Sequence, residues 1–270
     1  RGDSMGADTK ALRNRIKSVN STLHLTKAMG LVASSKIRKA NEAMQKGRSY
    51  VKSLEDILAV LAASPECQKS PYMRAEGDRT RLIVIAGDRG LAGGYNANIF
   101  RLVREYPTAE IIPIGKRACD RFGKQTVSSE YFSGGEAFTM AKEQCEDFTR
   151  GNYDKLGIIS TRYVSMMTQE AVIRWVFPLV PPTEQKAASV LFEPDEATIL
   201  EAAIPEYVAG LIAMSVRESF ACEVAARRMA MDSAGKNAGQ MIEDLQLQYN
   251  RARQSAITQE ITEIVAGSGV

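Results

Sequence analysis

Apolar residues recur with a seven-residue period along the first sixty positions of the chain. Stepping alternately by four and three from residue 12 reaches fifteen positions, of which twelve are apolar. A repeat sustained for this length predicts a coiled-coil helix. The positions are Leu12, Ile16, Val19, Leu23, Thr26, Gly30, Ala33, Ile37, Ala40, Met44, Gly47, Val51, Leu54, Leu58 and Leu61.

The limits of this first helix follow from its prolines. None occurs between Thr9 and Ala63, and Pro65 stops the pattern, so we expect a coiled-coil helix over residues 8–63. Fifty helical residues at about 1.5 Å each span about 75 Å, which exceeds a small domain. We therefore expect the helix to protrude from the rest of the protein.

The period changes in the middle of the chain. Residues 64–80 are polar and predict a linker, and residues 81–194 predict an α/β domain. Short runs rich in β-branched residues predict strands, and the segments between them predict helices. Their alternation favours an open, mostly parallel sheet, with Pro113 placing the second strand at an edge. The expected strands are 81–86, 110–115, 128–132, 155–160 and 171–179, and the expected helices are 96–105, 116–122 and 137–149.

A second long helix is predicted over residues 195–268. Asp195 is a suitable N-cap, and Pro205 is the position where a bend or a restart is expected. Its apolar stripe is less regular and comprises Met241, Leu245, Ile257, Ile261 and Ile264. Neither terminal helix has a partner in its own segment. The predicted fold class is therefore α/β plus coiled coil: an antiparallel pair of terminal helices with an inserted Rossmann-like domain.

Charge is unevenly distributed, although the chain as a whole carries only +3. Between residues 10 and 52 a single acid, Glu42, stands against eleven basic residues: Lys10, Arg13, Arg15, Lys17, Lys27, Lys36, Arg38, Lys39, Lys46, Arg48 and Lys52. Such a helix predicts an acidic partner, which could be nucleic acid, an anionic membrane or acidic protein loops. Residues 245–265 mix apolar and polar side chains around the whole helix, which is typical of a helix enclosed by other proteins.

The candidate chemistry is sparse. The Gly-rich loop at residues 87–94 follows a strand, but it matches neither GxGxxG nor a P-loop, so a structural turn is the better interpretation than a nucleotide site. The single histidine, His24, and the four dispersed cysteines form no catalytic or zinc-binding pattern. We expect no catalytic residue, cofactor or metal. No apolar run approaches the length of a membrane span, and no signal peptide is evident.

Several motifs resemble one known family, the gamma subunits of bacterial-type rotary (F-type) ATP synthases. They are IKSVNST at 16–22, LTKAMGLVASSKIRK at 25–39, DRGLAGGYNAN at 88–98, AARRMAMDSAGKN at 225–237 and YNRARQSAITQEITEIVAG at 249–267. The similarity runs collinearly from about residue 9 to the end, and the terminal motifs are the most specific. The resemblance implies a non-catalytic rotor shaft that couples proton or sodium flow to ATP synthesis.

The resemblance also implies partners and contact residues. The partners are the alpha and beta subunits, the epsilon subunit and the membrane c-ring, with the protein peripheral at the cytoplasmic face of the cell membrane. Arg253 and Gln254 are implied to contact catch loops of beta. The full set of implied coupling or partner contacts is Met29, Lys36, Arg38, Lys39, Arg227, Arg253, Gln254 and Thr258. The alternative function is a basic coiled coil that binds nucleic acid, and a nucleotide-dependent α/β enzyme is a further rival.

Overall fold

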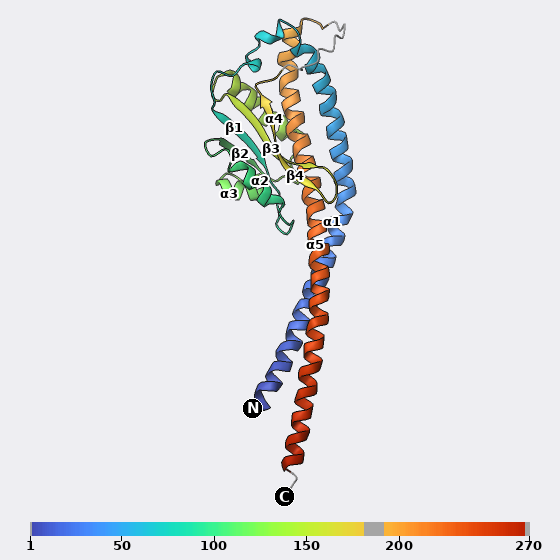
Figure 1. Cartoon of the computed structure of the whole chain (residues 1–270). Coiled ribbons are helices and arrows are strands. Elements are labelled where there is room, and N and C mark those ends of the chain that lie inside the picture. The colour runs from blue at the N-terminus through green and yellow to red at the C-terminus, as the bar shows by residue number, and fades with distance from the viewer. Residues whose placement is uncertain (1, 181–191, 268–270) are drawn as a thin grey trace. The chain divides into compact units, whose positions relative to one another are not determined.

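The computed structural model describes residues 2–180 and 192–267, with side chains from residue 8 onward. Its contacts divide into two compact units, one formed by residues up to 33 with those from 228 onward, the other by residues 34–227. The elements in chain order are α1 (Gly2–Ala62), η1 (Cys67–Lys69), η2 (Pro71–Met73), β1 (Thr80–Ile85), α2 (Tyr95–Val103), β2 (Glu110–Ile114), α3 (Lys116–Phe122), α4 (Gly134–Thr149), β3 (Lys155–Tyr163), β4 (Gln169–Phe177) and α5 (Glu196–Gly267) (Figure 1).

The heptad pattern of α1 is confirmed by burial. All fifteen of the positions predicted to form its seam are buried or half-buried. They include the two glycines, Gly30 and Gly47, at which the facing helix comes close. A methyl group placed on Gly47 would lie 3.5 Å from Met214 of α5, which is ordinary van der Waals contact.

The two long helices run antiparallel within each unit. In the first unit, Gly30 faces Met231 and Thr26 faces Gly235. In the second unit, Gly47 faces Met214, and Gly210 faces Tyr50. In both units the residue number falls along one helix as it rises along the other. The predicted antiparallel pairing is therefore confirmed within each unit.

The stripe predicted for the C-terminal helix is wrong except at Leu245. Leu245 is buried, whereas Met241, Ile257, Ile261 and Ile264 are all exposed. The side that faces α1 follows a second heptad, which mixes small and polar residues with larger apolar ones. Its buried or half-buried members are Met231, Gly235, Ala238, Ile242, Leu245, Tyr249, Ala252, Ala256 and Gln259. The sequence pattern predicted that the more hydrophobic face of α5 would pack against α1. In the structure, α1 packs against a different face of α5, the one that carries the smaller residues.

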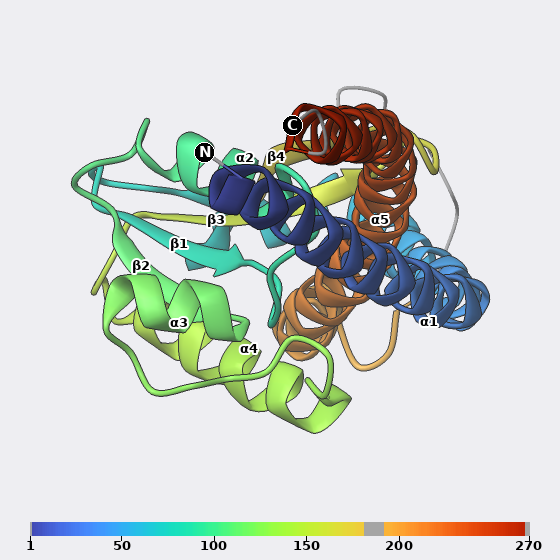
Figure 2. The same cartoon turned by 90° about the horizontal axis from the view of Figure 1, so that it is seen from below.

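The α/β domain contains a four-stranded sheet in the order β2-β1-β3-β4. β1 pairs in parallel with both β2 and β3, and β4 returns antiparallel to β3. The mostly parallel sheet is thus confirmed, and β2 with Pro113 lies at an edge as predicted. Figure 2 shows α2 and α4 on opposite sides of the strands.

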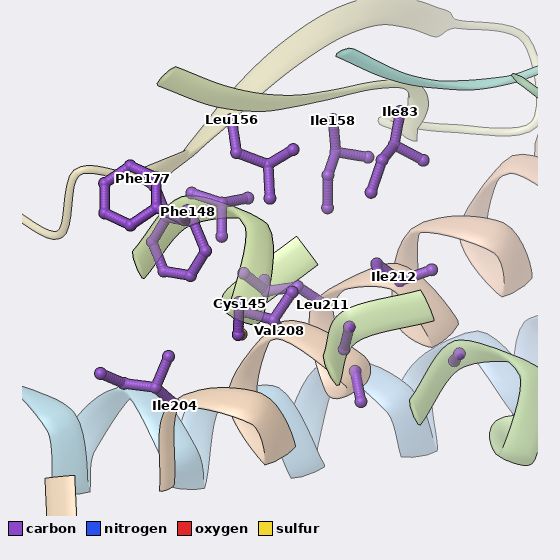
Figure 3. Close-up of a cluster of buried hydrophobic side chains, with 14 of the residues drawn as sticks. Ile83, Cys145, Phe148, Leu156, Ile158, Phe177, Ile204, Val208, Leu211 and Ile212 are labelled. Atoms are coloured by element: carbon purple, nitrogen blue, oxygen red, sulfur yellow. The ribbon is translucent and has the colours of Figure 1, made fainter. Parts of the chain in front are cut away.

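The core around the sheet has two parts because β1 is buried on both faces. Leu82 and Val84 pack with Ile99 and Val103 of α2 on one side. Ile83 and Ile85 point to the other side, where α4 and α5 cover the sheet. Figure 3 shows this second cluster, in which Ile83, Leu156 and Ile158 of the sheet face Phe148 of α4 and side chains of α5 that include Ile204, Val208, Leu211 and Ile212.

Two middle segments differ from the prediction. Residues 128–132 form no strand, because the backbone N–H groups of Ser129 and Glu130 bind the Asp88 carboxylate and not a neighbouring strand. Residues 64–80, expected to be a linker, contain η1 and η2. Tyr72 of η2 is buried and stacks on Phe148 with ring centroids 5.9 Å apart.

The start of α5 follows its sequence signal. The backbone N–H of Thr198 donates to Asp195 at 2.8 Å, which confirms Asp195 as the N-cap. The helix is continuous through Pro205. One window of α5 is long and apolar enough to cross a membrane by composition, contrary to expectation, but 56% of it is buried in the protein. Its apolarity is that of a core helix.

Candidate functional site

The predicted contact residues fall in both units. Arg253, Gln254 and Thr258 are exposed on α5, and Met29 is half-buried on α1. The Thr258 hydroxyl donates to the backbone oxygen of Gln254 at 2.9 Å, one turn earlier. Within this unit Arg253 and Gln254 therefore project side chains that a partner can reach.

The C-terminal part of α5 exposes large apolar side chains outside its seam. Ile264 is 70% exposed, and Leu247, Ile257 and Ile261 are each about half exposed. On α1 of the same unit, Leu25 and Leu31 are also exposed. Soluble proteins rarely leave such residues along one segment unless another molecule covers them. This surface is consistent with the predicted enclosure by other proteins.

The basic residues of α1 are mostly exposed. Nine of the eleven are exposed, and Lys36 and Arg48 are half-buried. Arg48 pairs with the buried Glu218 of α5 and also donates to the backbone oxygen of Tyr163 at 3.1 Å. The remaining nine charges present a basic surface that the rest of each unit does not bury.

Lys36, Arg38 and Lys39 are close in sequence but have different surroundings. Arg38 is exposed and reaches only Glu42, one turn along α1. Lys39 is also exposed. Lys36, in contrast, contacts Glu130 at 2.5 Å, and Glu130 also pairs with Arg89 of the Gly-rich loop. Lys36 therefore joins α1 to the α/β domain.

Arg227 is engaged inside the chain. Its guanidinium group donates to the backbone oxygen of Gly90 at 3.2 Å and pairs with Glu223 at 2.5 Å. The Glu223 side chain is only 3% exposed. Burial raises the pKa of the Glu223 carboxyl above its usual value, although the adjacent Arg227 opposes this shift.

The Gly-rich loop has one carboxylate of its own, that of Asp88. Asp88 accepts hydrogen bonds from the backbone N–H groups of Lys116, Ser129 and Glu130 and from the Ser128 hydroxyl. Burial acts to raise the pKa of Asp88, but these hydrogen bonds outweigh it and hold the pKa below its usual value. This arrangement fits the interpretation of the loop as structural.

The potential metal ligands, the cysteines and the histidine do not form a metal-binding or catalytic site among the described residues. Within residues 2–180 and 192–267 there is no group of three potential metal ligands. The four cysteines are buried and unpaired with one another. His24 lies exposed on α1.

Sequence reasoning missed Glu223 and Glu130. Glu223 had a usable signal: it is a lone acid in the otherwise small and apolar run from Phe220 to Ala226, four residues before Arg227. Glu130 had none, because only the folded chain brings it to Lys36, which is 94 residues away in the sequence.

Comparison with known proteins gives a consistent result. A family model described as ATP synthase matches residues 8–269. The ATP synthase gamma chain of Ruminococcus albus is 38% identical, and the alignment covers 97% of this chain and 98% of that one. The sodium ion specific ATP synthase gamma chain of Acetobacterium woodii is also 38% identical, with 98% and 99% covered.

Solved structures with the same fold include chains of mitochondrial ATP synthases. A chain in the OSCP/F1/c-ring structure from Euglena gracilis aligns with a TM-score of 0.67 at 18% identity, covering 98% of this chain and 97% of that one. A chain in the central stalk and c-ring structure from Tetrahymena thermophila aligns with a TM-score of 0.57 at 22% identity, covering 78% and 99%. At these identities the likeness concerns the fold.

Proposed function

The chain belongs to the family of ATP synthase gamma chains, and from this premise we propose that it is the central rotor shaft of an ATP synthase. It transmits rotation between the membrane c-ring and the ring of alpha and beta subunits, with the epsilon subunit beside it. It is a non-catalytic subunit, and catalysis takes place in the beta subunits.

The observation that carries this proposal at the level of residues is the exposed apolar surface of α5. Ile257, Ile261 and Ile264 are exposed on the part of the helix whose other side packs on α1. Together with the exposed Arg253 and Gln254, they make a surface of mixed polarity. Enclosure of the shaft by alpha and beta subunits accounts for this surface.

The basic surface of α1 supports a protein partner with acidic loops. In this proposal Arg38 and Lys39, which are exposed, meet acidic loops of the beta subunits. The nucleic-acid alternative draws on the same charge. It receives no support from the relatives described above, which are all ATP synthase gamma chains by name.

Rotation is coupled to catalysis through asymmetry. A pair of antiparallel helices has no threefold symmetry, so it cannot contact three surrounding catalytic subunits equally. A partner shifts a conformational equilibrium only by its differential affinity for the two states. Each orientation of the shaft therefore biases one catalytic subunit differently, and turning it moves that bias from site to site.

We assign the coupling contacts to the residues implied by the family motifs. Arg253 and Gln254 bind catch loops of beta, Thr258 supports them one turn along α5, and Met29 contributes from α1. Lys36 and Arg227 take part through the α/β domain, since their side chains are engaged with Glu130, Glu223 and Gly90. The complex is membrane-associated, and we place this subunit at its cytoplasmic face.

Reconstitution with alpha and beta subunits tests the proposal. We expect an assembled complex that hydrolyses ATP, measured as phosphate release after purification by size. Failure of the unsubstituted chain to assemble with subunits of its own organism contradicts the proposed function.

Arg253→Ala tests the finer assignment. The substitution removes a charged donor of the proposed contact with beta. Loss of one hydrogen bond to a charged group corresponds to about tenfold in an equilibrium or rate, so we expect ATP-driven ion pumping to fall by about that factor. Arg251→Ala is the matched control, because Arg251 is exposed on the same helix two residues away. Equal activity of the two variants contradicts the role of Arg253.

A further inference from the structure

The buried carboxylate of Glu223 lies against the Gly-rich loop. Glu223 belongs to α5 and is 2% exposed. A methyl group on Gly87 would lie 2.7 Å from the Glu223 carboxyl carbon, closer than such atoms approach in proteins. A side chain at position 87 would therefore force the Glu223 carboxylate to shift.

Arg227 contacts the same Glu223 carboxylate from α5. The same guanidinium group that pairs with Glu223 also donates to the backbone oxygen of Gly90. The loop itself is fixed by Asn96, whose side chain accepts from the Gly87 N–H at 2.9 Å and donates to the Arg89 oxygen at 3.3 Å. Loop and arginine thus form a receptor whose shape does not depend on Glu223 alone.

Further polar bonds continue along the same stretch of α5. The Tyr95 hydroxyl donates to the backbone oxygen of Ser219 at 3.0 Å, and the Ser219 hydroxyl accepts from the Thr161 N–H at 3.1 Å. Glu218 accepts from the Tyr163 N–H at 2.9 Å and pairs with Arg48 of α1. The end of β3 and the start of α2 are therefore joined to α5 by directional bonds.

The kind of bond matters for a part that must transmit force. Apolar contacts are non-directional, so they define the relative orientation of two groups less sharply than hydrogen bonds do. Hydrogen bonds weaken steeply when their angles change. A buried ion pair adds little net stability because desolvation offsets its attraction, yet leaving one partner unpaired is costly. Such a pair is better suited to fixing one orientation than to adding stability.

We propose that the Gly-rich loop at residues 87–94 is a carboxylate-binding site whose ligand is Glu223 of the same chain, and that this clamp fixes α5 to the α/β domain. If the chain is a rotor shaft, as proposed above, torque passes between the α/β domain and α5 at this clamp. This second part of the proposal rests on the proposed function. Glu223 is a positioning residue and touches no reacting atoms.

Hydrogen exchange in the assembled complex tests the binding site. Glu223→Ala removes the carboxylate, and Gly87→Ala pushes it out of the loop. In both variants we expect amide exchange of residues 87–95 to accelerate by about tenfold or more, as for loss of a hydrogen bond to a charged group. Added formate should slow exchange again in Glu223→Ala, where it has space, but not in Gly87→Ala.

Matched controls separate the clamp from general destabilisation. Glu206→Ala removes an exposed acid from α5, and Gly94→Ala adds a methyl group in the same loop with 3.7 Å of clearance. Both should exchange like the unsubstituted chain. If Glu223→Ala does not fold, Glu223→Gln keeps its shape and should still accelerate exchange. Unchanged exchange in Glu223→Gln and Gly87→Ala overturns the binding site.

Coupling in membrane vesicles tests the torque role. The readout is the membrane potential generated per ATP hydrolysed, which we expect to fall severalfold in Gly87→Ala and not in Gly94→Ala. An unchanged ratio, with exchange of the loop accelerated, overturns the torque role and leaves the proposed function standing. If the unsubstituted chain forms no active complex, the proposed function fails. The same exchange measurements, made on the free full-length chain, then still decide whether the clamp exists.

Discussion

At the end of β1, the carboxylate of Asp88 holds together segments that are far apart in the sequence. It accepts from Lys116 at the start of α3 and from three groups in residues 128–130. These bonds keep residues 128–132 out of the sheet, and Glu130, beside them, reaches Lys36. One side chain thus decides the path of a loop and the placement of a neighbouring ion pair.

Asp88→Asn should destabilise the α/β domain in a pH-dependent way. The pKa of Asp88 in the folded protein is lowered from 3.8. Its charge therefore contributes stability that is fully present above the unfolded-state pKa and is lost as the pH falls through the folded-state pKa. We expect the free energy of unfolding at pH 7 to fall by about 1–3 kcal/mol.

Urea unfolding from pH 7 down to about pH 3 measures this effect. The difference between Asp88→Asn and the unsubstituted chain should shrink in acid. Asp120→Asn, an exposed acid on α3, serves as the control and should have little effect at any pH. A difference that stays constant with pH contradicts the ionised role of Asp88.

At the scale of elements, α5 has one face for its own chain and another for partners. Leu245 and Leu247 lie two residues apart, yet Leu245 is 6% exposed and Leu247 is 58% exposed. The first belongs to the seam with α1, and the second points away from it. The same residue type therefore has two different roles within one turn of helix.

This pair of leucines allows a direct comparison. Leu245→Ala removes buried atoms from the seam and should lower the unfolding free energy of the helix pair by about 2–4 kcal/mol. Leu247→Ala should change it by less than about 0.5 kcal/mol, as is usual for surface positions. Thermal unfolding of the chain followed by circular dichroism checks both values.

Binding of alpha and beta subunits should depend on the exposed Leu247, although the stability of the free chain does not. Leu247→Ala should weaken association with alpha and beta subunits. The free energy of unfolding of the free variant should stay close to that of the unsubstituted chain. If Leu247→Ala assembles as tightly as the unsubstituted chain, this face of α5 takes no part in binding at that position.

For the whole molecule, the net charge of +3 hides a basic helix. Nine exposed basic residues on α1 have only Glu42 as an acidic neighbour along the same stretch. Exposed charges of this kind act over about a Debye length, which shortens as salt is added. They speed encounters with acidic surfaces more than they strengthen the final contact.

We therefore expect assembly with alpha and beta subunits to be slower at high salt. The association rate should fall by about tenfold between roughly 0.05 and 0.5 M salt. Stopped-flow fluorescence measures the rate. Lys17→Gln combined with Lys27→Gln, both exposed on α1, should flatten this dependence. A rate that is insensitive to salt contradicts electrostatic guidance by α1.

Features that depend on local, repeated signals could be predicted from the amino-acid sequence. The heptad of α1 gave its seam correctly at every position, because each step of the pattern reinforces the next. The β-branched run at β1, the edge position of Pro113 and the N-cap Asp195 were also correct, since each depends on a few neighbouring residues. The family motifs and the comparisons agree on the function.

Features that depend on residues far apart in the sequence became visible in the folded chain alone. α5 carries apolar residues on more than one face, and the small seam residues such as Ala238 and Ala252 face α1 because they allow close approach. The path of residues 128–132 depends on Asp88, and the surroundings of Arg227 depend on Gly90 and Glu223. Local pattern cannot predict these contacts, because their energies arise only when distant segments meet.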